Sequence, residues 1–358
     1  MNTFYCICGN TLFFENSQCL SCGQKVGWCT ACRRITALLH ESNGVYRCGN
    51  PDCGTAIAKC YNYAVEGVCN RCVVVNGTAP DPAALCDCCV YNDTVPDLSV
   101  EGNREKWGRL EAAKRRLFFT LDHLGLPHGT EASGFDPPLA FDFKADRIPG
   151  NEFWRTMGKE ERVYTGHANG KITINIREAD SAERESIRVD LNEAHRTLIG
   201  HFRHEIGHYY WDLLVKGKRE ADSVRVFGDH ENPAYAEALD RHYSEGPPAD
   251  WQQNFISAYA TMHPWEDFAE TFAAYLDLTS VLDTANNVGF GPVPDVLTAD
   301  LDELVAAKRR IGVAMNEMNR TMGLLDFFPK MLVPPVVEKM RFVHELVRGC
   351  SVAAVQVA

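Results

Sequence analysis

The chain has 358 residues, of which 45% are hydrophobic and 23% are charged, and its formal net charge is −12 at pH 7. This composition is typical of globular proteins and excludes broad disorder, and the length indicates about two domains. No stretch approaches the roughly 18 apolar residues that a membrane helix needs, so we expect no membrane partner. The negative charge argues against a protein whose main role is to bind nucleic acid.

Cysteines are concentrated in the first quarter of the chain. Fourteen of the 15 lie between Cys6 and Cys89, and the last is Cys350. The residues before Cys6 lack the basic region and the apolar stretch of a secretory signal, which favours a cytoplasmic protein. Clustered cysteines in that compartment bind metal more often than they form disulfides, so we predict a zinc-binding module.

The cysteine spacing predicts up to three zinc sites with four cysteines each. A tight turn brings two thiolates to one tetrahedral ion, and a second pair completes the site. The predicted sites are Cys6, Cys8, Cys19 and Cys22; Cys29, Cys32, Cys48 and Cys53; and Cys60, Cys69, Cys86 and Cys89. At the third site Cys72 is an alternative to Cys60, and Cys88 is then left over.

The role of this module is a separate question. Residues 1–100 contain six Lys and Arg against eight Asp and Glu, so they lack the basic surface that is typical of nucleic-acid binding. The zinc ions could serve only to fold a segment that is too small and polar to fold alone. The alternative is a surface that binds protein or regulates the rest of the chain.

Helical and extended patterns follow the cysteine-rich segment. Apolar residues at helical spacing predict a first helix, in which Lys114, Arg115 and Arg116 are expected to face solvent. Asn169-Gly170 between two extended runs predicts a β-hairpin. The predicted strands are 139–143, 162–167 and 171–176. The predicted helices are 103–124, 192–215, 233–244, 250–261, 265–279, 296–315 and 335–348. Strands followed by helices indicate an α+β fold.

The helix predicted over 192–215 contains the sequence His204-Glu205-Ile206-Gly207-His208. Two histidines four residues apart share one helix face, so both imidazoles can reach one zinc ion. Glu205 lies beside the same ion and can take a proton from the attacking water and return it to the leaving amine. The pattern therefore predicts a hydrolytic zinc site.

A third protein ligand is required, with one position left for water. Trp211 and Leu214 occupy the positions of the glycine and the third histidine of the longer motif, so we expect a carboxylate instead. One candidate pair is Asp229 and Glu231, in a predicted loop. The other is Glu266 and Glu270, which lie four apart on one face of an otherwise apolar helix that begins at Pro264.

The chain resembles a bacterial family of zinc-binding metallopeptidases that carry an N-terminal zinc ribbon. The resemblance covers nearly the whole chain and is clearest over 6–16, 109–117, 200–212 and 263–270. It implies a zinc-ribbon domain over 1–100 and a zincin-like metallopeptidase domain over 101–358. The resemblance implies that the family cysteines match the first and third predicted sites. The four cysteines of the second site are then an addition in this chain, and so are Cys72 and Cys88.

The metal site also resembles, locally, that of the anthrax lethal factor peptidase. This likeness implies that Glu266 is the third zinc ligand and that Tyr259 faces the reacting carbonyl. Tyr259 would then stabilise the oxyanion by hydrogen bonding. Glu270 and Asp212 are expected to orient the ligand histidines.

We therefore predict a cytoplasmic zinc endopeptidase that acts on peptides or proteins. It would hold one catalytic Zn²⁺ and two or three structural Zn²⁺, and nucleic acid is not expected among its partners. The alternative is a zinc-dependent protein-interaction module whose peptidase-like domain hydrolyses nothing. A protease recruited to DNA-bound proteins would need a basic surface, and the charge balance counts against it.

Overall fold

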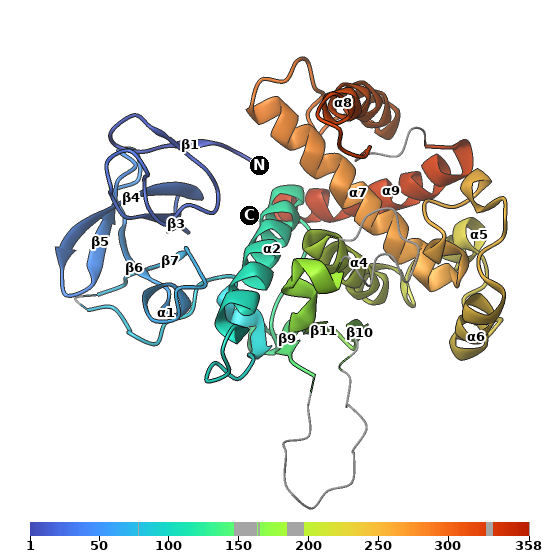
Figure 1. The fold of residues 1–358 in the computed structure, drawn as a ribbon, viewed down its shortest axis with the longest axis horizontal. Helices are drawn as coiled ribbons and strands as arrows, with labels where there is room; N and C mark the ends of the chain where they lie inside the picture. Colours follow the sequence, from blue (N-terminus) through green and yellow to red (C-terminus); the bar gives the residue numbers. More distant parts are fainter. Residues whose placement is uncertain (78, 147–162, 164, 185–196, 327–331, 358) are drawn as a thin grey trace, which may run out of the picture. The chain divides into compact units, whose positions relative to one another are not determined.

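The computed structural model describes residues 1–77, 79–146, 163, 165–184, 197–326 and 332–357. The chain forms two compact units. The first comprises Met1–Arg116, Ala140–Thr165 and Thr173–Glu183, and the second comprises Leu117–Leu139, Gly166–Ile172 and Arg184–Ala358. Figure 1 shows the fold and labels most of its helices and strands. The domain boundary expected between residues 100 and 101 stays a prediction.

The cysteine-rich part of the first unit is built from short strands. A small pair joins β1 (Phe4–Tyr5) to β2 (Thr11–Leu12). A five-stranded antiparallel sheet follows, in which each strand pairs with the next along the chain. Its strands are β3 (Val26–Cys29), β4 (Arg34–Ser42), β5 (Val45–Cys48), β6 (Ala56–Lys59) and β7 (Cys72–Val74). The short helix α1 (Tyr61–Ala64) lies between the last two strands.

Cysteines stand at the ends of several of these strands. Cys29 ends β3, Cys48 ends β5, and Cys60 follows β6 directly. A domain this small has a limited apolar core, so the arrangement of its strands depends also on what holds their ends. The sequence analysis assigned no strands here; apart from β4, these strands have only two to four residues, too few for an alternating pattern to develop.

Helix α2 (Asn103–Leu124) occupies the predicted range. The expectation that its central basic residues face solvent is correct only for Arg116. Lys114 is buried, with Nζ 2.9 Å from Glu111 Oε1, and Arg115 is buried, where Nη1 donates to the Val68 carbonyl at 2.7 Å. These partners stabilise charges that would otherwise be costly to bury.

A four-stranded sheet has the order β10-β11-β9-β8. Its strands are β8 (Asn92–Thr94), β9 (Ala140–Lys144), β10 (Gly166–Ala168) and β11 (Lys171–Asn175), and β8 runs parallel to β9. Asn169 and Gly170 form the predicted turn with φ values of 49° and 81°, which Asn and Gly tolerate best. The first part of the strand predicted over 162–167 lies largely outside the described residues. Among the described strands, β10 lies at one edge of the sheet.

The second unit is helical and is organised around α7 (Pro264–Asn287), which packs against α4, α5, α8 and α9. The other helices are α4 (Leu198–Tyr210), α5 (Glu220–Phe227), α6 (Tyr235–Glu245), α8 (Leu301–Thr321) and α9 (Pro334–Val357). A π-helical turn, Trp211–Val215, continues α4. The start of the helix predicted over 192–215 lies outside the described residues.

One predicted helix is wrong. Residues 250–261 contain only two 3₁₀ turns, Trp251–Gln253 and Tyr259–Thr261, and the second of these packs against α7. The combination of sheets and helices confirms the α+β class. None of the helices in the described ranges combines the length and the apolar character needed to cross a membrane.

Candidate metal centres

Helices α4 and α7 pack closely enough to bring their side chains to one point. A Cβ atom on Gly207 would lie 2.9 Å from the Cα of Ala269 and 3.0 Å from its carbonyl oxygen, so glycine permits this approach. The Thr197 hydroxyl caps α4 by accepting from the Gly200 amide at 3.0 Å. His263 Nδ1 caps α7 by accepting from the Trp265 amide at 3.1 Å, which places Glu266 in the first helical turn.

Three side-chain atoms converge between these helices. His204 Nε2 and His208 Nε2 are 3.2 Å apart, and Glu266 Oε2 lies 3.0 Å from the first and 3.3 Å from the second. Zinc with ligand bonds of about 2.0–2.1 Å spaces tetrahedral ligand atoms by about 3.3–3.4 Å. Two imidazoles and a carboxylate are ligands that zinc accepts. The donor set and its spacing therefore fit a zinc ion.

Other side chains hold the three converging groups in place. Glu270 Oε1 lies 2.7 Å from His204 Nδ1, a contact that would leave Nε2 of that ring as the metal-binding atom. The His208 ring lies against Trp265, with 3.7 Å between centroids. The Tyr235 hydroxyl donates to Glu266 Oε1 at 2.8 Å.

The site has an excess of negative charge. Burial opposes ionisation of Glu266, but His208 and His204 hold the pKa of Glu266 well below its ordinary value. Burial disfavours the charged form of His204 as well, but Glu266 and Glu270 raise its pKa well above the ordinary value. Burial lowers the pKa of His208. Two carboxylates thus lie against two imidazoles, and a divalent cation would offset the negative charge of the carboxylates.

The two proposed catalytic residues lie beside this group. Glu205 is buried on α4 between the two histidines. The Tyr259 ring lies 5.9 Å from the His204 ring between centroids. Burial, and then the charge of Glu266, raise the pKa of Tyr259, so its hydroxyl remains protonated at neutral pH. It can therefore donate a hydrogen bond.

Asp212 is not brought to the ligand histidines. Its Oδ2 lies 4.0 Å from Nδ1 of His167, a residue of β10 whose side chain is buried. Among the described residues, His208 Nδ1 has no hydrogen-bond partner. The chain leaves the α-helical path after Tyr210, and the wider turn of Trp211–Val215 removes Asp212 from the register that would place it against His208.

The carboxylates of the rival candidate pair lie elsewhere. Asp229 is exposed, and its Oδ1 accepts from the Glu231 amide at 2.9 Å. Neither residue belongs to a metal-binding group in the described part of the chain. This is a local turn of the kind that aspartate often forms.

Sequence reasoning missed three neighbours of the centre, which are Tyr235, Trp265 and His167. Tyr235 begins α6, and no periodic pattern in the sequence relates it to Glu266. Burial, and then the neighbouring His208, lower the pKa of His167 to about 3, so it is neutral. Of the three residues, only Trp265 had a signal in the sequence, which is its position next to Glu266.

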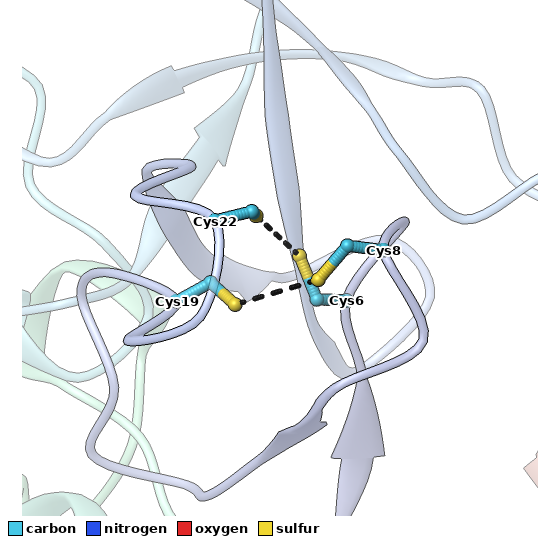
Figure 2. A group of neighbouring side chains, drawn as sticks. All are labelled: Cys6, Cys8, Cys19 and Cys22. Atoms are coloured by element: carbon cyan, nitrogen blue, oxygen red, sulfur yellow. Dashed lines mark hydrogen bonds between the residues drawn. The ribbon is translucent and has the colours of Figure 1, made fainter.

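The cysteines gather into the three predicted groups of four. Figure 2 shows the first group, in which Cys6, Cys8, Cys19 and Cys22 point toward one centre. The sulfur atoms are 3.7 Å apart for both Cys6–Cys22 and Cys8–Cys19. Zn–S bonds of about 2.3 Å place tetrahedral sulfurs about 3.8 Å apart.

The other two groups have similar spacing. The sulfurs are 3.7 Å apart for Cys32–Cys48, 4.0 Å for Cys29–Cys53 and 3.8 Å for Cys69–Cys86. The third group contains Cys60 and not Cys72. All three groups therefore fit zinc ions.

Comparison with known proteins agrees with this arrangement. A family model described as "Putative zinc-binding metallo-peptidase" matches residues 103–346, and one described as a zinc-ribbon domain matches residues 3–100. Uncharacterized proteins of Mycobacterium tuberculosis and Mycobacterium bovis are each 36% identical over 356 residues, with 97% of this chain and 95% of the relative covered. No solved structure matches, so the local likeness to the anthrax lethal factor peptidase stays a prediction.

Proposed function

The chain belongs to the zinc-binding metallopeptidase family and carries an N-terminal zinc-ribbon domain, and from this premise we propose that it is a zinc-dependent endopeptidase. The observation that carries the proposal is the convergence of His204, His208 and Glu266 beside Glu205. In this proposal residues 101–358 form the peptidase domain and residues 1–100 the ribbon domain. The protein would hold one catalytic and three structural zinc ions in the cytoplasm.

Zinc held by His204, His208 and Glu266 would act as a Lewis acid for the water and the peptide carbonyl. Glu205 accepts a proton from the water as its oxygen attacks the carbonyl carbon. The same carboxylic acid then gives that proton to the amide nitrogen as the C–N bond breaks, so Glu205 ends in its starting state. Tyr259 donates a hydrogen bond to the carbonyl oxygen while that oxygen carries negative charge.

The position of the edge strand β10 favours a peptide as the substrate. It packs against α4, and its His167 ring lies 6.3 Å from the His208 ring between centroids. An extended peptide can pair with the edge of such a strand and so align its backbone for cleavage. We propose that β10 binds substrate in this way.

The test is a comparison of the purified protein with its Glu205→Gln variant on a bacterial cytosolic proteome, followed by sequencing of the new N-termini. Glutamine keeps the size of the side chain but cannot accept the proton, so cleavage should fall on the order of 10²–10⁴-fold. Both proteins should hold the same amount of zinc. A variant that retains wild-type cleavage would contradict the mechanism.

A different result would favour the non-catalytic alternative. If wild type and Glu205→Gln both generate no new N-termini while both hold zinc, the protein is better described as a zinc-dependent interaction module. A positive control with a known metallopeptidase in the same proteome establishes that cleavage is detectable.

A further inference from the structure

The two oxygens of the Glu266 carboxylate have different neighbours. Oε2 lies 3.0 Å from His204 Nε2 and 3.3 Å from His208 Nε2. Oε1 accepts a hydrogen bond from the Tyr235 hydroxyl at 2.8 Å. Either oxygen of a carboxylate can bind zinc, so the hydroxyl distinguishes two otherwise equivalent atoms.

Tyr235 is held in this position by the start of α7. Its ring lies edge-on to the rings of His263 and Trp265, with 5.3 and 5.8 Å between centroids. His263 caps α7, and Trp265 directly precedes Glu266. The ring and the hydroxyl of Tyr235 therefore contact the same helical turn, which fixes the direction of the hydroxyl relative to the carboxylate.

We propose that Tyr235 is a positioning residue that restricts Glu266 to ligation of zinc through one oxygen and so keeps a ligand position for water. The inference rests on the proposed function, because a hydrolytic zinc site needs that open position and a structural site does not. Without the hydroxyl, the carboxylate can turn and offer both oxygens to the ion. Ligation through both would occupy the space that the water needs.

The helix that carries Tyr235 has few buried side chains through which it could affect the metal centre. α6 is mostly exposed, and Ala238 is its one buried residue. The link between α6 and the metal centre thus depends on few side chains, of which Tyr235 makes the contact with a candidate ligand. Hydrogen bonds to ligand side chains typically change metal affinity or activity 10–100-fold when removed.

The test uses Tyr235→Phe, which keeps the ring and its contacts with His263 and Trp265 and removes only the hydroxyl. Tyr275→Phe is the matched control. Tyr275 also lies on α7 but away from the metal centre, and the substitution removes its hydroxyl, which is 2.9 Å from His344 Nδ1. Each full-length protein, with zinc in its cysteine sites, is loaded with Co²⁺ at the histidine site, and Glu266→Ala supplies the spectral baseline.

The first readout is the visible absorption of Co²⁺, which weakens as the coordination number rises. We expect weaker absorption in Tyr235→Phe and an unchanged spectrum in Tyr275→Phe. The second readout is the kinetics of the zinc protein. We expect kcat to fall about 10–100-fold in Tyr235→Phe.

An unchanged Co²⁺ spectrum in Tyr235→Phe would overturn the inference, whatever the activity. So would a folded variant that binds no Co²⁺, because Tyr235 would then be required for metal binding itself. If the spectrum changes while the wild-type protein hydrolyses nothing, the role of Tyr235 stands and the proposed function fails.

Discussion

Glu266 and Asp229 are carboxylates with contrasting surroundings, and this contrast decides which can serve as a zinc ligand. Glu266 is buried with Oε2 against two imidazoles, whereas Asp229 is exposed and its carboxylate accepts from a backbone amide. We expect Glu266→Ala to bind one zinc ion fewer than the wild type, because two histidines alone complete only half of a tetrahedral site. Asp229→Ala should lose none. Metal analysis of the purified proteins measures both, and the reverse pattern would show that the third ligand is misassigned.

Residue spacing within one helix was readable from the sequence, and contacts between distant residues were not. His204 and His208 share a helix face because of their separation alone. Tyr235 reaches Glu266 only through the fold of the intervening chain. Asp212 is four residues after His208, but the π-helical turn removes it from the α-helical register. The neighbouring sequence contains no pattern that predicts this turn.

Lys114 illustrates the same limit for charged residues. Glu111 and Lys114 are three apart, which is also the spacing of ordinary surface pairs. Their burial follows from partners elsewhere in the chain. The Asn92 side chain donates to Glu111 at 2.8 Å, and the Lys114 ammonium lies 5.5 Å from the centre of the Phe141 ring. A helical pattern cannot distinguish this buried pair from a solvated one.

At the scale of elements, the crossing of α4 and α7 determines whether the metal centre forms. Gly207→Ala would introduce a methyl group 2.9 Å from the Cα of Ala269. We expect the helices to separate, at a cost of about 1–3 kcal/mol in the free energy of unfolding. The displaced histidines should bind the catalytic zinc more weakly.

Gly349→Ala is the matched control for this change. Gly349 lies on α9, and a Cβ there would have no atom within 4 Å. Alanine should leave zinc binding unchanged and slightly favour the helix. Urea unfolding and metal analysis compare the two variants. Equal zinc content and stability in both would show that the approach at Gly207 is not needed.

The three cysteine groups differ in exposure, which predicts an order of zinc release. In the first group Cys8 and Cys22 are exposed, whereas all four cysteines of the third group are buried. Chelators and thiol reagents must reach the ligands to displace the metal. We expect the first group to lose zinc earliest and the third group last. Timed chelation with alkylation and mass spectrometry follows each cysteine, and simultaneous modification of both groups would contradict this order.

Strongly patterned elements were the ones that the sequence predicted well. Helix α2 and the Asn169-Gly170 hairpin follow from an apolar stripe and from turn residues that tolerate positive φ. Most ribbon strands have only two to four residues, so no periodicity develops in them, whereas the nine-residue β4 was missed although its length would allow a pattern. Residues 250–261 have helical spacing, yet only isolated 3₁₀ turns form there.

At the scale of the whole molecule, the two compact units have different sources of stability. Cysteine groups hold the strand ends in the first unit. In the second unit, large apolar side chains of α4 and α7, including Phe202, Phe268 and Phe272, are fully buried. Burial of such a side chain contributes about 1.5–3 kcal/mol without any metal. Zinc removal should therefore affect the two units unequally.

We expect exhaustive chelation to unfold the five-stranded sheet of the first unit and to leave α7, α8 and α9 folded. Without zinc, the cysteines at the strand ends lose the ion that joins them, and the free energy of metal binding no longer contributes to the fold. Hydrogen exchange followed by mass spectrometry should show lost protection over residues 26–74 and retained protection over 264–287. Added zinc should restore the first region, because the change is a binding equilibrium. Equal loss of protection in both regions would show that the helical unit also depends on the ribbon zinc ions for its fold.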